Sequence, residues 1–305
     1  MSKIALLGVL SSAVFSGTSL LYATLGEIVA ERAGIVNLGL EGVLLVSAST
    51  GFAVTSLTDN PYLGVLAAVI AGGLMNMILG YLVLNRRANQ LASGLALMFF
   101  GFGLSAWVGK GFVGAKIVGL PRLALPGSSG LPKLYASLLR FDILIYIAVP
   151  VAIAIWWVLF RTRWGLGVRA VGESPETAYA SGRDPRVIRY QALWLAGMLA
   201  GVGGSHLSIA YAMNWTEYMT AGLGFIAIAL VIFAKWHPLY AVAGALLFSG
   251  AVAFQLLLQS SGIQVSPFLL STIPYVLTLV VLMAWGGRRR ATAPASLGRV
   301  YQGAE

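Results

Sequence analysis

The chain has 305 residues, of which 58% are hydrophobic and only 10% are charged, and its net charge is +10. An ordinary soluble domain carries roughly 25% charged residues, so this composition excludes a water-soluble globular protein and predicts an all-α polytopic membrane protein. Cysteine is absent, and the two histidines, His206 and His237, lie far apart in the sequence. No metal site is expected, because a metal motif needs ligands at close spacing.

Apolar runs that approach the length of a hydrocarbon core, about 20 helical residues, recur along the chain. We expect about eight to ten transmembrane helices in a single domain over residues 1–287. The first run lacks a clear small-x-small cleavage site, so we expect it to remain as a helix rather than to be removed as a signal peptide. The candidate runs are 4–22, 38–57, 62–84, 91–109, 141–160, 190–210, 218–235, 238–258 and 268–286.

The basic residues indicate which loops face the cytoplasm. Alternating the runs places fourteen Lys or Arg residues on one side and six on the other. Because basic loops tend to stay inside, the richer side is predicted to be cytoplasmic and the N-terminus to lie outside. A re-entrant 23–37 segment would change this parity. The same topology accounts for the net charge, so no nucleic-acid partner is expected. The cytoplasmic segments would be 23–37, 85–90, 161–189, 235–237 and the tail from 287.

The stretch GIVNLGLEG, residues 34–42, combines three glycines with Asn37 and Glu41. In a helix these two polar side chains would share a face, but each glycine costs about 1 kcal/mol relative to alanine. We therefore expect a broken or re-entrant start of a membrane helix, with both side chains facing protein or a cavity. Two interpretations stay open. An Asn37–Glu41 hydrogen bond could hold a local bend, or the pair could line a path through the membrane.

Other polar side chains within the runs should also face the bundle interior or a wet cavity, because contact with lipid is costly. Asn76 lies between Gly72 and Gly80 at four-residue spacing, which favours an interhelical hydrogen bond. A lone histidine such as His206 is more often structural, and Glu217 can be a solvated loop acid. The candidate path residues are Asn37, Glu41, Asn76, His206, Asn214 and Glu217, with Gln255 and Gln259 as further buried polar residues.

The 161–189 loop, RTRWGLGVRAVGESPETAYASGRDPRVIR, contains a compact helix signal. Ser174 can cap, Pro175 fits the first helical position, Glu176 suits the positive end of the dipole, and Gly182 can take the left-handed conformation that ends a helix. The predicted two turns, about 10 Å long, are too short to be stable alone. The loop is either a tether that binds anionic lipid through its arginines or a coupling helix that docks in a groove of a motor protein.

Two further segments lie on the predicted cytoplasmic side. The sequence KWHP at 235–238 turns the chain between two runs and places Trp236 at the membrane interface. The tail 288–305 is basic, then small and polar, and we expect it to be disordered.

Four segments in order resemble one protein family. They are GEIVAERAGIVNLGLEG (26–42), RTRWGLGVRAVGESPETAYASG (161–182), GFIAIALVIFAKWHP (224–238) and IPYVLTLVVL (273–282). They resemble the permease subunits of bacterial ABC importers in the branched-chain amino acid and simple sugar permease superfamily. Within it they look most like the nucleoside-type branch that works with basic-membrane-protein-family binding lipoproteins. The resemblance covers about residues 20–286.

The resemblance implies a type II-like importer permease that is not itself an enzyme and needs no cofactor. A cytoplasmic ATPase with fused nucleotide-binding halves would use ATP, a second and different permease would complete the channel, and an outer binding lipoprotein would deliver a nucleoside, a related polar solute or a simple sugar. The location would be the bacterial cytoplasmic (inner) membrane, in contact with lipid. The chain has no G-x-x-x-x-G-K-[ST] stretch, which fits a separate ATPase. The implied ATPase-coupling residues are Arg169, Gly172, Glu173, Ser174, Pro175, Glu176, Ala178 and Gly182.

Two other functions are alternatives to an importer permease. A secondary transporter would use an ion gradient, with Glu41 as a proton site, and would work without an ATPase. An intramembrane enzyme would need a nucleophile or metal constellation, and the runs show no His/Glu/Asp cluster.

Overall fold

The computed structural model describes residues 3–124, 140–260, 266–286 and 293–300. These residues are mostly helical, so the all-α prediction is confirmed. A two-stranded antiparallel sheet pairs Leu123 with Phe141. The elements are α1 (Lys3–Arg32), α2 (Leu40–Thr58), α3 (Pro61–Gly80), η1 (Tyr81–Asn85), α4 (Gln90–Gly109), η2 (Lys110–Phe112), β1 (Leu123–Ala124), β2 (Arg140–Phe141), α6 (Ile143–Arg161), α7 (Arg163–Glu173), α8 (Pro175–Ala180), α9 (Pro185–Ser205), η4 (His206–Tyr211), α10 (Leu223–Phe233), α11 (Pro238–Ser260), α12 (Pro267–Leu270) and α13 (Ile273–Gly286).

Seven helices in the described part of the chain are long and apolar enough to cross a membrane, so this is a multi-pass membrane protein. Two of the nine predicted runs form shorter helices. The run 218–235 contains only α10, which is 11 residues, or about 16 Å, long. The segment before it cannot continue the helix because Tyr218, Ala221 and Gly222 have positive φ. The run 268–286 is divided by a turn between α12 and α13.

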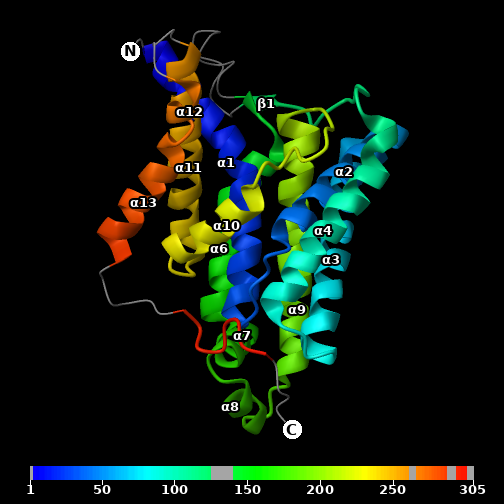
Figure 1. The fold of residues 1–305 in the computed structure, drawn as a ribbon, viewed down its shortest axis with the longest axis vertical. Coiled ribbons are helices and arrows are strands. Elements are labelled where there is room, and N and C mark those ends of the chain that lie inside the picture. Colours follow the sequence, from blue (N-terminus) through cyan, green and yellow to red (C-terminus); the bar gives the residue numbers. More distant parts are fainter. Residues whose placement is uncertain (1–2, 125–139, 261–265, 287–292, 301–305) are drawn as a thin grey trace.

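Helices α1, α2 and α9 form the centre of the bundle, since most of each span is buried. The more exposed helices α3, α4, α6 and α11 surround them (Figure 1). Glycine permits the closest of these contacts. A Cβ atom on Gly72 would overlap the carbonyl oxygen of Gly197, and one on Gly201 would lie 2.5 Å from that of Ala68. The small residues of α9 thus serve close packing against α3, as the four-residue spacing indicates.

The bundle has two distinct ends (Figure 1). The N-terminus, α12 and β1 lie toward one end, and α7 and α8 lie at the opposite end, which we call the inner end because the predicted topology makes it cytoplasmic. Residues 293–300 also lie at the inner end, where Ser296 donates its backbone N–H to Gly172 of α7 at 2.9 Å. The expectation of disorder is therefore wrong for 293–300, because this segment has tertiary hydrogen-bond partners. Residues 288–292 and 301–305 of the tail lie outside the described residues.

Candidate coupling and translocation sites

Helix α8 forms where the sequence signals predict it. The hydroxyl of Ser174 accepts the backbone N–H of Thr177 at 3.2 Å, and Pro175 occupies the first turn. Gly182 follows the helix with φ +77°, and its N–H bonds to the carbonyl of Tyr179 at 2.8 Å. The helix has six residues, somewhat fewer than the two turns expected. Its existence is confirmed, while its role in coupling stays a prediction.

Helix α8 has an anchored face and a free face. Pro175 and Ala178 are buried, whereas Glu176 and Tyr179 are exposed. In Figure 1 the helix lies at the tip of the inner end, beyond α7. An exposed acid and an exposed aromatic ring on a fixed short helix are suited to contact another protein.

Sequence reasoning missed helix α7, which is 11 residues long. The hydroxyl of Thr162 caps it by accepting the N–H of Gly165 at 3.0 Å. Its buried face includes Val168 and Val171 at three-residue spacing, but the glycines at 165, 167 and 172 on either side of them obscured that pattern. The apolar spacing together with Thr162 was the signal that could have found it.

Three of the implied coupling residues belong to α7 rather than to the α8 turn. Arg169 lies over the ring of Phe160 at 5.2 Å, so it points back to α6. Gly172 lies so close to α1 that a Cβ atom there would overlap the carbonyl oxygen of Arg32. The carboxylate of Glu173 accepts the N–H of Ala295 at 3.3 Å. These residues connect α7 to the bundle and do not share the free face of α8.

The GIVNLGLEG stretch is a break between helices, because α1 ends at Arg32 and α2 begins at Leu40. Gly34 has φ +86°, a left-handed conformation that favours glycine. Asn37 and Glu41 are both buried, as expected. Of the two open interpretations, the Asn37–Glu41 hydrogen bond is wrong, since the two side chains belong to different contacts and the chain between them is not helical throughout.

Asn37 belongs to an amide network that joins the break to α3 and α9. Its Nδ2 donates to Oδ1 of Asn76 at 2.9 Å, and its Oδ1 accepts the N–H of Gly39 at 2.8 Å. Asn76 in turn donates to the carbonyl of Leu193 at 3.0 Å. The predicted interhelical hydrogen bond of Asn76 is confirmed. The nitrogen and oxygen atoms of both side-chain amides all have a protein partner, so the network holds helices together.

Glu41 binds the start of α10. Its carboxylate accepts the hydroxyl of Thr220 at 2.5 Å and the backbone N–H groups of Gly222 at 2.7 Å and Gly224 at 2.6 Å. The side chain is 4% exposed. A carboxylate is stabilised there because a helix N-terminus carries partial positive charge and unpaired N–H groups. Glu41 therefore fixes the short helix α10 to the beginning of α2.

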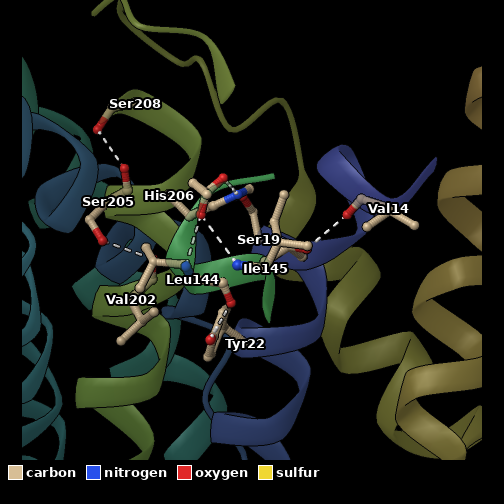
Figure 2. Close-up of polar contacts among 11 residues, drawn as sticks. Val14, Ser19, Tyr22, Leu144, Ile145, Val202, Ser205, His206 and Ser208 are labelled. Carbon is tan, nitrogen blue, oxygen red and sulfur yellow. Dashed lines mark hydrogen bonds and ion pairs between the residues drawn. The ribbon is translucent and has the colours of Figure 1, made fainter. Parts of the chain in front are cut away.

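His206 lies in a buried polar cluster at the junction of α1, α6 and η4 (Figure 2). Its Nδ1 is 2.8 Å from the hydroxyl of Ser19, and its Nε2 is 3.3 Å from a carboxylate oxygen of Asp142. Asp142 also caps α6 by accepting the N–H groups of Leu144 at 2.9 Å and Ile145 at 3.2 Å. Both ring nitrogens of His206 thus face protein groups, which favours a structural role for this histidine.

Burial raises the pKa of Asp142, but the hydrogen bond and charge of His206 and the two helix N–H groups outweigh it, so its pKa lies below the usual range. Ser19, His206 and Asp142 are the residue types of a hydrolase triad, and Asp142 was missed although it lies within the 141–160 run. All three side chains are almost fully buried, with 3%, 0% and 1% exposed. This burial gives a substrate no access, so the cluster offers no support for an enzyme.

The other candidates lie apart from these contacts. Asn214 and Glu217 are exposed on the irregular segment before α10, and Gln255 and Gln259 are partly buried on α11. The structure thus distributes the candidate path residues over separate places. Four of them are inside the subunit and two are on its surface.

Two buried acids of α1 were also missed. The carboxylate of Glu27 accepts the N–H of Asn37 at 2.9 Å, and that of Glu31 accepts the indole N–H of Trp236 at 2.5 Å. Both acids fall in the predicted 23–37 loop because the first apolar run ends at residue 22, whereas α1 continues to Arg32. Their four-residue spacing in a segment with apolar neighbours was the available signal.

Comparison with known proteins assigns the chain to a family. The family described as "Branched-chain amino acid transport system / permease component" matches residues 9–284. The chain belongs to this permease family. It is therefore an ABC transporter permease, which confirms the resemblance found in the four ordered segments. No solved structure matches the chain significantly.

Several curated relatives cover nearly the whole permease. The putative glucose ABC transporter permease protein TsgC13 of Haloferax volcanii is 36% identical, with 90% of each chain covered. The guanosine ABC transporter permease protein NupQ of Bacillus subtilis is 31% identical, with 92% of each chain covered. The nucleoside ABC transporter permease protein NupC of Lactococcus lactis is 31% identical, with 96% of each chain covered.

Each of these organisms also has a second matching permease protein of lower identity. They are TsgB13, NupP and NupB, at 24%, 22% and 25% identity. In each pair this permease is more similar to one member than to the other, namely to TsgC13, NupQ and NupC.

Proposed function

We propose that the chain is one permease subunit of a binding-protein-dependent importer that carries a nucleoside or a related small polar solute, with a simple sugar as the alternative cargo. A cytoplasmic ATPase would drive it, and an outer binding lipoprotein would deliver the solute, in the bacterial cytoplasmic membrane. The observation that carries this proposal is α8, a helix capped at Ser174 and free on the face of Glu176 and Tyr179.

Helix α8 is attached so that a force on it would reach the bundle. Ala178 is 2% exposed, and its carbonyl accepts the N–H of Arg183 at 3.0 Å. The guanidinium of Arg183 donates to the carbonyl of Arg163 at the start of α7, at 2.9 Å. The helix and the loop after it are therefore tied to α7, which suits a part that passes on movement of a docked ATPase.

The pairing of relatives supports a second and different permease subunit. NupP and NupQ are both named guanosine permease proteins of one organism, and NupB and NupC are both named nucleoside permease proteins of another. Since this chain is more similar to one member of each pair, we assign it that position in a heterodimer, with a NupP-like chain as its partner.

The cargo is assigned from the relatives named for guanosine and nucleosides, although a relative of higher identity is named for glucose. Uptake of labelled guanosine and of labelled glucose by the assembled transporter distinguishes the two. Saturable guanosine uptake that excess glucose does not reduce is the expected result, and the reverse pattern would assign the cargo to sugars.

The coupling role of α8 is tested by changing its free face. In a complex with the cognate ATPase, Glu176→Lys combined with Tyr179→Ala should weaken ATPase binding and abolish the increase in ATP hydrolysis that solute-loaded binding protein causes. Tyr62→Ala is the matched control, because Tyr62 is similarly exposed, 55% against 48% for Tyr179, but lies on α3. Unchanged binding and stimulation in the double variant would refute the coupling assignment.

An ion-coupled secondary transporter is the second candidate, with Glu41 as the proton site. Three protein donors, on the segment before α10 and at its start, already occupy that carboxylate, so it serves as a packing contact. Family membership also favours the ATP-driven mechanism. Flux driven by an ion gradient through the isolated chain would reverse this preference.

A further inference from the structure

The segment 293–300, which we call the strap, binds the C-terminal end of α7. Ser296 donates both its N–H and its hydroxyl to the carbonyl of Gly172, at 2.9 and 2.7 Å. Ala295 donates its N–H to the carboxylate of Glu173 at 3.3 Å. Ser296 is 5% exposed, and Leu297 packs against the hydrophobic core. The strap is thus joined to the last turn of α7, directly before α8.

Two side chains, from α9 and α4, bind both the strap and the break between α1 and α2, residues 33–39. Arg189 of α9 donates to the carbonyl of Ala33 at 3.0 Å and to the hydroxyl of Ser296 at 3.1 Å. Gln90 of α4 donates to the carbonyls of Gly34 at 3.1 Å and Arg299 at 2.8 Å. Each of these side chains holds the break with one contact and the strap with another.

Gln90 adds a further contact to the break, because its carbonyl oxygen accepts the N–H of Val36 at 2.9 Å. Arg189 and Gln90 are 2% and 0% exposed. Buried hydrogen bonds of this kind are costly to break, since the groups that they pair have no water to replace the lost partner. The strap, the break and the end of α7 therefore form one connected polar unit.

The break leads directly to the contacts that position α10. Asn37 bonds to Asn76 of α3, and Glu41, at the start of α2, holds the first N–H groups of α10. A displacement of the break would consequently act on α3 and α10. Helix α7 also touches the last residue of α1, directly before the break, where a side chain on Gly172 would overlap the Arg32 carbonyl.

We propose that the strap is a transmission element, which keeps α7–α8 and the 33–39 break moving as one unit so that displacement of α8 by the ATPase reaches α10. Ser296 and Gln90 are the positioning residues of this unit. The inference rests on the proposed importer function, because it requires a partner that moves α8. We therefore expect that loss of the strap lowers the amount of solute imported per ATP hydrolysed, while the subunits stay assembled.

The test uses the complete complex of both permeases, the ATPase and the binding protein in liposomes. Ser296→Ala and truncation after Thr292 should leave assembly and basal ATP hydrolysis intact. They should lower the solute imported per ATP hydrolysed by about tenfold, which corresponds to about 1.4 kcal/mol. Ser260→Ala is the matched control, since among the described residues the Ser260 hydroxyl bonds to the Leu257 carbonyl of its own helix, at 2.9 Å. A wild-type import-to-hydrolysis ratio in the Ser296→Ala variant would overturn the proposal.

A cross-link tests whether the strap must stay attached. The chain has no cysteine, so Ala295→Cys with Glu173→Cys gives a single pair that a short thiol-reactive cross-linker can join. We expect the cross-linked complex to import at least as well as the same variant before cross-linking. Loss of import on cross-linking would instead identify a lid that has to release, and would overturn the proposal.

The outcome for the strap is distinguishable from the outcome for the importer function. If solute-loaded binding protein fails to stimulate the wild-type complex, the importer function is wrong. If the wild type is stimulated and the strap variants keep the wild-type ratio, only the strap proposal is wrong.

Discussion

Glu41→Gln removes the charge that holds α10 to α2. The carboxylate accepts three hydrogen bonds, from the hydroxyl of Thr220 and from the N–H groups of Gly222 and Gly224. Glutamine keeps one acceptor oxygen but places an NH₂ donor where the second carboxylate oxygen accepts. At least one of these bonds must be lost, and a hydrogen bond to a charged group contributes about 1.5–3 kcal/mol.

The lost interaction of the charge with the helix N-terminus adds about 0.3–1 kcal/mol. We therefore expect Glu41→Gln to lower the free energy of unfolding by about 2–4 kcal/mol. The chain has eight tryptophans, so the apparent melting temperature of the purified protein can be followed by intrinsic fluorescence.

Glu217→Gln is the matched control, because Glu217 is an exposed acid in the segment that precedes α10. It should leave the melting temperature unchanged. If Glu41→Gln is as stable as the wild type and assembles normally but has lost uptake, the carboxylate serves the solute path and the packing account is refuted.

Two further substitutions test the other buried polar contacts. Asn76→Ala removes the bonds to Asn37 and Leu193, and each interhelical hydrogen bond in a membrane protein contributes about 0.6 kcal/mol, so we expect a loss of about 1 kcal/mol. Asn37→Ala added to it should cost less than it does alone, and additive effects in this double-mutant cycle would contradict the network. The pKa of Asp142 is lowered in the folded protein. Its contribution to stability is therefore present above the unfolded pKa, about 3.9, and is lost as the pH falls through the lower folded pKa. Asp142→Asn should accordingly destabilise the protein at pH 7 and have a smaller effect below about pH 4; a constant difference in melting temperature across this range would contradict the assignment.

Local signals predicted the parts of the fold that local interactions determine. Ser174, Pro175 and Gly182 define α8 within the nine positions 174–182, and each takes the role that its residue type favours. The broken helix at 34–42 was likewise evident from its glycines. Asn76 was predicted to bond between helices because an amide flanked by small residues has few other partners in a membrane.

The parts that depend on distant partners could not be predicted in this way. The run 218–235 reads as a full span, but α10 begins only at Leu223, where Glu41, far away in the sequence, binds its first N–H groups. The strap looked disordered because its small polar residues give no periodic pattern, and its order comes from Arg189 and Gln90. Glu27 was placed in a loop because apolar run length alone cannot show that a buried carboxylate will find the N–H of Asn37.

The proposed function of this permease, as part of an ATP-driven importer, can be tested by transport. The most direct measurement is uptake of labelled guanosine into liposomes that contain the chain, its partner permease and the ATPase, with binding protein outside and ATP inside. We expect uptake that requires ATP and the binding protein and that continues when ion gradients are collapsed. Uptake by the isolated chain, driven by an ion gradient without ATP, would contradict it.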